Sequence, residues 1–130
     1  MPQKLVPGDV FWLAGTGGSA NPGNRHRFIC LAANSNGDDY LIVPICTPQP
    51  QSDRTCELTP NKYTPLTHRS YVAYHLMREI SQRALDAAVF GNQFKLQPAL
   101  PLHTLTIVKA GVAQSAESKP RLQAYLEAHG

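Results

Sequence analysis

Residues 28–47 read FICLAANSNGDDYLIVPICT, and this stretch decides the fold. Two apolar runs, at 28–31 and 40–47, flank a polar segment at 34–39. The segment contains Asn36-Gly37, a pair that tolerates positive φ and is typical of tight hairpin turns. The run at 40–47 is apolar at nearly every position, so other parts of the protein should cover both its faces. The stretch therefore predicts an antiparallel hairpin whose second strand is buried on both sides.

Shorter strands are predicted around this hairpin. Residues 8–13 predict a strand before it, and residues 53–58 and 70–74 predict two strands after it. Residues 75–81 fit either a continued strand or the start of a helix, and we favour a strand with a break near His75. Eleven prolines and nine glycines separate short pieces, a spacing typical of a small barrel or sandwich.

The C-terminal third has helical periodicity. Pro101 suits a first helical turn, and the apolar residues after it recur near a period of 3.6, in a helix that Gly111 would weaken or end. A last helix is predicted with Ser118 as its cap and Pro120 in its first turn. Its apolar stripe consists of Leu122, Tyr125 and Leu126. The fold class predicted is α+β, with about five strands followed by helices.

Composition limits the kind of protein. A chain of 130 residues fits a single domain, 1–130, that buries a core without disulfides. Its longest apolar run is about eight residues, against the roughly 20 that a membrane span needs, and no signal-like segment opens it. We therefore expect a cytoplasmic location and no membrane partner. The three cysteines, Cys30, Cys46 and Cys56, are expected to be free thiols in strands, and they lack zinc-ligand spacing, so neither a metal site nor a cofactor is expected.

Positive charge is concentrated in the second half of the chain. Residues 1–65 carry five basic and five acidic side chains, whereas residues 66–130 carry seven and four. This hints at an anionic partner, although a surface that is basic without a partner explains it equally well.

A glycine-rich loop at residues 15–24 precedes Arg25, His26 and Arg27. Neither of the common phosphate-loop spacings is present, and a strand rather than a helix follows. We interpret the loop as a mobile lid over a groove. The three basic residues after it are either phosphate contacts in that groove or exposed charges at a strand end.

The order of strand, glycine-rich loop, Arg27 and a buried strand ending at Thr47 resembles the PemK/MazF-like family of small endoribonuclease toxins. The resemblance covers roughly residues 6–82. Arg27-Phe28-Ile29 stands where the family has Arg-Pro-Val or Arg-Pro-Ile. Pro44-Ile45-Cys46-Thr47 stands where the family has Pro-Ile-Thr, so an ungapped match puts Cys46 on the family's threonine and Thr47 one residue later.

The resemblance implies an SH3-like β-barrel and a reaction. Family members cut single-stranded RNA without a metal, by attack of the 2′-hydroxyl on its own phosphate. The resemblance implies that Arg27 stabilises the charged phosphate, that Thr47 or Cys46 assists, and that His26 is a base or acid. It also implies a toxin–antitoxin system, with RNA as substrate, an antitoxin protein as partner and a two-fold homodimer.

Further polar residues are candidates for secondary roles. We expect Arg25, Lys62, His68 and Arg69 to contact RNA, and we expect a polar network on one face of the barrel. The network's members are Asp53, Thr55, Ser70 and Tyr74, unless these side chains merely bond nearby backbone groups. The alternative function is a catalytically inactive SH3-like barrel that binds nucleic acid or a protein partner.

Overall fold

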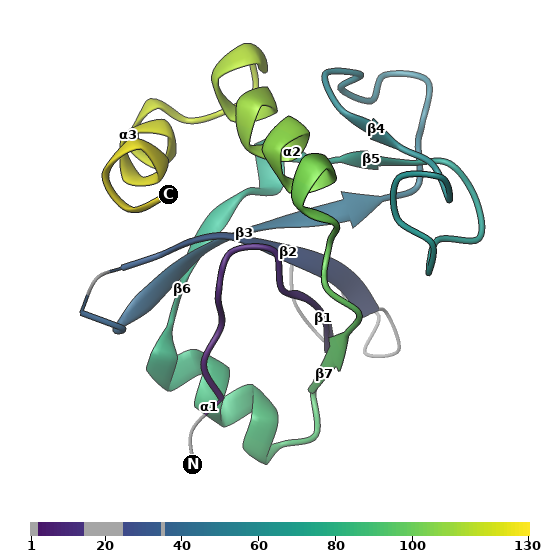
Figure 1. Cartoon of the computed structure of the whole chain (residues 1–130). Helices are drawn as coiled ribbons and strands as arrows, with labels where there is room; N and C mark the ends of the chain where they lie inside the picture. Colours follow the sequence, from purple (N-terminus) through teal and green to yellow (C-terminus); the bar gives the residue numbers. More distant parts are fainter. Residues whose placement is uncertain (1–2, 15–24, 35) are drawn as a thin grey trace.

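The computed structural model describes residues 3–14, 25–34 and 36–130, and places the elements in the order shown in Figure 1. The first half holds β1 (Val10–Ala14), β2 (Arg25–Ala33), β3 (Asp39–Cys46), β4 (Glu57–Leu58) and β5 (Ser70–Val72). The second half holds the 3-10 helix η1 (Tyr74–Leu76), β6 (Arg78–Ser81), α1 (Gln82–Phe90), β7 (Phe94–Gln97), α2 (Leu102–Gln114) and α3 (Pro120–His129). The α+β class is confirmed.

The predicted hairpin is the centre of an antiparallel sheet. β2 pairs with β3, with Arg27 opposite Ile45, and Gly37 in the turn has a φ of 74°. The strand order is β4-β5-β3-β2-β1-β7, and β6 also pairs with β3. Along this path the described strands form an open sheet with β4 and β7 at its ends.

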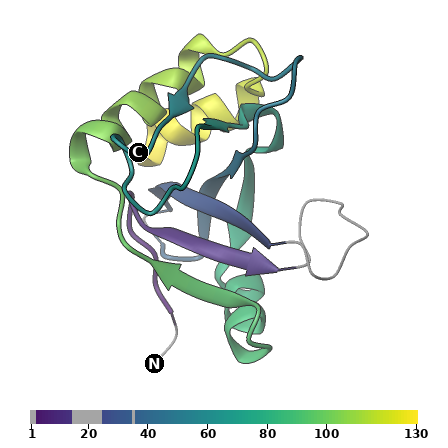
Figure 2. The ribbon, with the colours of Figure 1, turned by 90° about the vertical axis from the view of Figure 1, so that its right-hand side faces the viewer.

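Both faces of β3 are covered, as its apolar sequence predicts. Helices α2 and α3 lie over one face of the sheet and α1 over the other (Figures 1 and 2). Val43 packs in a cluster with Val108 of α2, whereas Ile42, the next side chain along, packs in a second cluster with Leu85 of α1. Alternate side chains of one strand thus serve two cores, which fixes its register.

The expected number of about five strands was too low. Residues 82–97, for which no element was predicted, contain α1 and β7. Helix α1 follows β6 directly, and the Ser81 hydroxyl accepts a hydrogen bond from the Ala84 backbone N–H at 3.0 Å as its N-cap. β7 pairs with β1 and extends the sheet. The predicted strand at 53–58 is shorter, because Asp53 forms a turn with Thr55 and only Glu57–Leu58 pairs.

The C-terminal helices follow the prediction apart from their boundaries. Helix α2 continues through Gly111 to Gln114, and α3 begins with Pro120 at its first turn but has Lys119 rather than Ser118 as its N-cap residue. Leu122 of α3 is buried, with Tyr125 and Leu126 packed against the same core. Within the described part of the chain, no helix has the length and apolar character needed to cross a bilayer.

Candidate functional site

A groove of about 560 Å³ opens where β3 ends, beside β1, β2 and the segment that leads into β5. Its polar lining consists of His26, Arg27, Thr47, Thr67, His68 and Ser70. Its apolar lining consists of Trp12, Ile45, Cys46, Pro65 and Leu66. We call it the Arg27 groove. It brings together side chains from four separate stretches of sequence.

Arg27 is held by aromatic rings. In the sheet it lies opposite Trp12, and its guanidinium carbon is 4.5 Å from the Trp12 ring centroid and 5.8 Å from that of Tyr63. Burial raises the pKa of the Tyr63 hydroxyl, and the Arg27 charge acts in the opposite direction. Arg27 Nε is buried and has no hydrogen-bond partner in the described residues. A stacked cation with an unused donor, in a groove, is suited to binding an anion.

His68 lies between two threonine hydroxyls. Thr47 Oγ1 is 3.3 Å from His68 Nε2, and Thr67 Oγ1 is 3.3 Å from Nδ1. A hydroxyl either donates or accepts a hydrogen bond, so both tautomers of the ring are compatible with these contacts. The arrangement suits a side chain that takes up and releases a proton. From the sequence, His68 was predicted only as a phosphate contact.

Thr47 and Cys46 have different surroundings. Both line the Arg27 groove, Cys46 as the last residue of β3 and Thr47 as the residue that follows it. Thr47 is exposed, whereas Cys46 is half-buried, and burial raises the pKa of its thiol. Of the two, Thr47 has the better position to assist at a phosphate held by Arg27.

His26 is the second imidazole in the groove. It is next to Arg27 on β2, and its ring lies edge-on to Phe28 with centroids 6.5 Å apart. Among the described residues, the groove thus contains two histidines and one arginine.

Two of the other predicted RNA contacts, Lys62 and Arg69, lie elsewhere. Lys62 donates a hydrogen bond to the Glu57 carbonyl at 3.4 Å, and Arg69 forms an ion pair with the Glu57 carboxylate at 3.4 Å. Neither lines the Arg27 groove. The backbone of Arg25 lies opposite Ala14 in β2. The predicted lid, residues 15–24, lies outside the described residues.

The four residues of the predicted polar network have different hydrogen-bond partners. Asp53 does accept hydrogen bonds from the Thr55 backbone N–H at 2.9 Å and the Thr55 hydroxyl at 2.6 Å. Its other oxygen accepts one from the Ser115 hydroxyl, which the sequence did not indicate. Ser70 instead bonds the His68 carbonyl at 3.4 Å, and Tyr74 bonds the Val108 carbonyl at 2.7 Å in the core.

No protein-family model matches the chain, and no curated protein does either. Among the described residues, no group of three or more His, Cys, Asp or Glu side chains is placed to hold a metal ion. Function has to be inferred from the chemistry of the groove.

Proposed function

We propose that this chain is an endoribonuclease of the PemK/MazF-like toxin type, which cleaves single-stranded RNA in the Arg27 groove without a metal ion. The observation that carries the proposal is the contact of Thr47 with His68 in the groove that also holds Arg27 and His26. Cleavage of RNA by its own 2′-hydroxyl needs a base, an acid and positive charge at the phosphate. These are the groups that line the groove.

The reaction proceeds by proton transfer between RNA and two imidazoles. One neutral imidazole, of His26 or His68, removes the proton of the 2′-hydroxyl as O2′ attacks phosphorus. The imidazolium of the other gives a proton to the departing 5′-oxygen. The products are a 2′,3′-cyclic phosphate and a 5′-hydroxyl, and imidazole suits both roles because it exchanges a proton near neutral pH.

Arg27 stabilises the charge that builds up on the phosphate. Its guanidinium donates two parallel hydrogen bonds to phosphate oxygens. The Trp12 ring on which it stacks limits its motion, so little side-chain entropy is lost on binding. Thr47 orients His68 and donates to the same phosphate when the substrate displaces one of its contacts.

The test is cleavage of short RNAs by purified protein in the presence of a chelator. Arg27→Ala should reduce the rate by about 10²–10³. Arg83→Ala is the control, because it removes an exposed arginine of α1 outside the groove and should leave the rate unchanged. Unmodified protein that cuts none of several RNAs would contradict the proposal.

A substrate with sulfur in place of the bridging 5′-oxygen identifies the acid. A thiolate leaves without a proton, so this substrate should restore the rate of the variant that lacks the acid but not of the variant that lacks the base. His26→Ala and His68→Ala are the pair to compare, and His103→Ala, at an exposed position on α2, is the control.

Two structural features support the finer parts of the proposal, an SH3-like barrel and a homodimer. β3 pairs with β6 through residues 39–42 and with β5 through residues 45–46, a division of one strand that bends a sheet toward a barrel. β7 is an end strand with Leu96 half-exposed, and such edges favour pairing with a second copy. Light scattering should give a mass of twice 14.2 kDa, and Leu96→Lys should reduce this mass to that of one chain.

An antitoxin protein, cytoplasmic location and toxin activity are part of the same proposal, and induced expression in bacteria should arrest growth.

A binding module without catalysis is the second candidate. It is favoured by Cys46 and Phe28, which stand where the family has threonine and proline. RNA that binds, is not cut, and still needs Arg27 for binding would support this candidate.

A further inference from the structure

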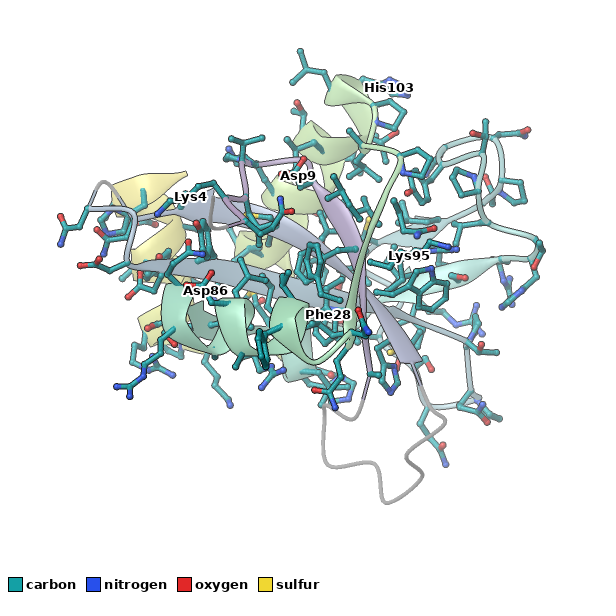
Figure 3. All side chains as sticks on the ribbon, turned by 90° about the horizontal axis from the view of Figure 1, so that it is seen from below. Lys4, Asp9, Phe28, Asp86, Lys95 and His103 are labelled. Carbon is teal, nitrogen blue, oxygen red and sulfur yellow. The ribbon has the colours of Figure 1, made fainter. Side chains whose placement is uncertain are left out.

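A second hollow of about 270 Å³ adjoins the Arg27 groove, and His26 lines both. Its apolar wall consists of Phe28, Pro44, Leu76 and Met77, of which Phe28 lies on the face of the sheet toward α1 (Figure 3 labels Phe28 from that side). Arg78 and Lys119 supply its charged groups. We call it the Arg78 pocket. A chain of nucleotides that crosses the Arg27 groove passes beside it, because the two share a wall.

The polar groups of the pocket are mainly hydrogen-bond donors. Arg78 has its guanidinium carbon 5.7 Å from the Phe28 ring centroid and forms no ion pair with a described carboxylate. Lys119 is an exposed ammonium group. His75, at the edge, is paired with Glu117 at 3.2 Å, and no carboxylate lines the pocket. The occupant should be a flat apolar group with hydrogen-bond acceptors along one edge.

We propose that the Arg78 pocket binds the base of a nucleotide next to the cleaved phosphate and selects guanine. Guanine presents two adjacent acceptors, O6 and N7, which match the two parallel donors of an arginine. Adenine presents a donor, its N6 amino group, beside N7, and this donor would meet a guanidinium N–H, so only one of the two hydrogen bonds could form. The inference rests on the proposed function, since it makes the Arg78 pocket the specificity site of the Arg27 groove.

The experiment measures binding separately from cleavage. Trp12 is the chain's one tryptophan and lies in the Arg27 groove, so its fluorescence reports an occupied groove. The probes are 2′-O-methyl pentanucleotides, which lack the attacking hydroxyl, with one guanine moved from position to position. At the best position, 7-deazaguanine or adenine should weaken binding by about 5- to 100-fold, and inosine, which keeps O6 and N7, should not.

Arg78 variants test the assignment. Arg78→Ala should lose the preference for guanine over 7-deazaguanine, whereas Arg78→Lys should keep part of it, because a lysine ammonium still donates to O6 and N7 but lacks the fixed planar pair of donors. Arg83→Ala should keep it, and circular dichroism checks that each variant is folded. Equal binding of all bases, or a preference that survives in Arg78→Ala, would overturn the inference. If the preference follows Arg78 but no unmodified RNA is cut, the cleavage proposal fails and the specificity site stands.

Discussion

Thr47 Oγ1 lies 3.3 Å from His68 Nε2, although the two residues are 21 positions apart in the sequence. The contact follows from the sheet. Cys46 pairs with Tyr71 between β3 and β5, so the chain leaving β3 passes the chain entering β5. The register of two short strands thus determines the orientation of the proposed proton carrier.

Thr47→Val should slow RNA cleavage by about 10-fold or more, because valine keeps the shape but removes the hydroxyl that orients His68 and donates to the phosphate. The kinetics to measure are kcat and KM with a short RNA. We expect the loss mainly in kcat, since the hydroxyl acts as charge develops.

Cys46→Ala is the matched variant for this prediction. It changes the residue that an ungapped family match puts on the catalytic threonine. Cys46 also lines the Arg27 groove, but the hydroxyl that contacts His68 belongs to Thr47. The activity of Cys46→Ala should stay within about threefold of the unmodified protein. A loss larger than that of Thr47→Val would transfer the proposed role to the thiol.

Local sequence patterns predicted the central hairpin, the two-sided burial of β3 and the C-terminal helices. These three features follow from side-chain periodicity and turn chemistry, which can be recognised within a segment of about ten residues. Helix α1 and β7 were missed, because few of their apolar side chains are buried: Leu85 is the buried residue of α1, and β7 is held by pairing with β1. Long-range pairing is not visible in one short segment.

The candidate site was predicted unevenly for the same reason. Arg27 and Thr47 came from a resemblance in local motifs, and the structure brings both to one groove. The contact of Thr47 with His68 depends on the β3–β5 register, and that of Asp53 with Ser115 depends on how α2 packs. Neither has a local signal, so the sequence did not indicate the contact of His68 with Thr47 or that of Asp53 with Ser115.

Gly111→Ala should destabilise the fold, although alanine normally favours a helix over glycine. A Cβ at this position would come within 2.0 Å of the Tyr74 hydroxyl oxygen and 2.7 Å of its ring. The Tyr74 side chain is fully buried and its hydroxyl donates a hydrogen bond to the Val108 carbonyl, so neither this side chain nor α2 has room to move. We expect a loss of about 1–3 kcal/mol in the free energy of unfolding, measured by urea denaturation. Gly91→Ala, at the exposed end of α1, should cost less than Gly111→Ala, because its Cβ would lie 3.3 Å from the Ala87 carbonyl oxygen rather than 2.0 Å from a buried side chain.

The free energy of unfolding should fall in acid partly because of Asp53. Burial alone would raise the pKa of this carboxyl, but hydrogen bonds from Ser115 and Thr55 outweigh it and hold the pKa below its ordinary value. A carboxyl with a lowered pKa in the folded state stabilises the fold above the unfolded pKa of about 3.9, and that stability is lost as the pH falls through the folded pKa.

Asp53→Asn should therefore lower the free energy of unfolding at pH 7 and reduce its decrease between pH 6 and pH 3, as measured by urea denaturation in a series of buffers. Glu127→Gln, at an exposed position on α3, is the control and should keep the decrease of the unmodified protein. An unchanged acid dependence in Asp53→Asn would mean that other carboxyls account for it.

The three thiols should react with a thiol reagent in a fixed order, which gives a test of the groove that does not depend on cleavage. The thiolate is the reactive form, and burial raises the pKa of all three thiols, that of Cys30 to about 12, so exposure decides the order of reaction. Both are almost fully buried, whereas Cys46 is half-buried and lines the Arg27 groove. At pH 8 we expect one thiol to be labelled in the folded protein and three after denaturation, with none in folded Cys46→Ser.

A non-cleavable 2′-O-methyl RNA should slow the labelling of Cys46 severalfold in the unmodified protein, because the phosphate contact with Arg27 holds the RNA over the thiol. In Arg27→Ala the same RNA should slow labelling much less. RNA that binds tightly and leaves this rate unchanged would mean that the RNA site is elsewhere on the surface.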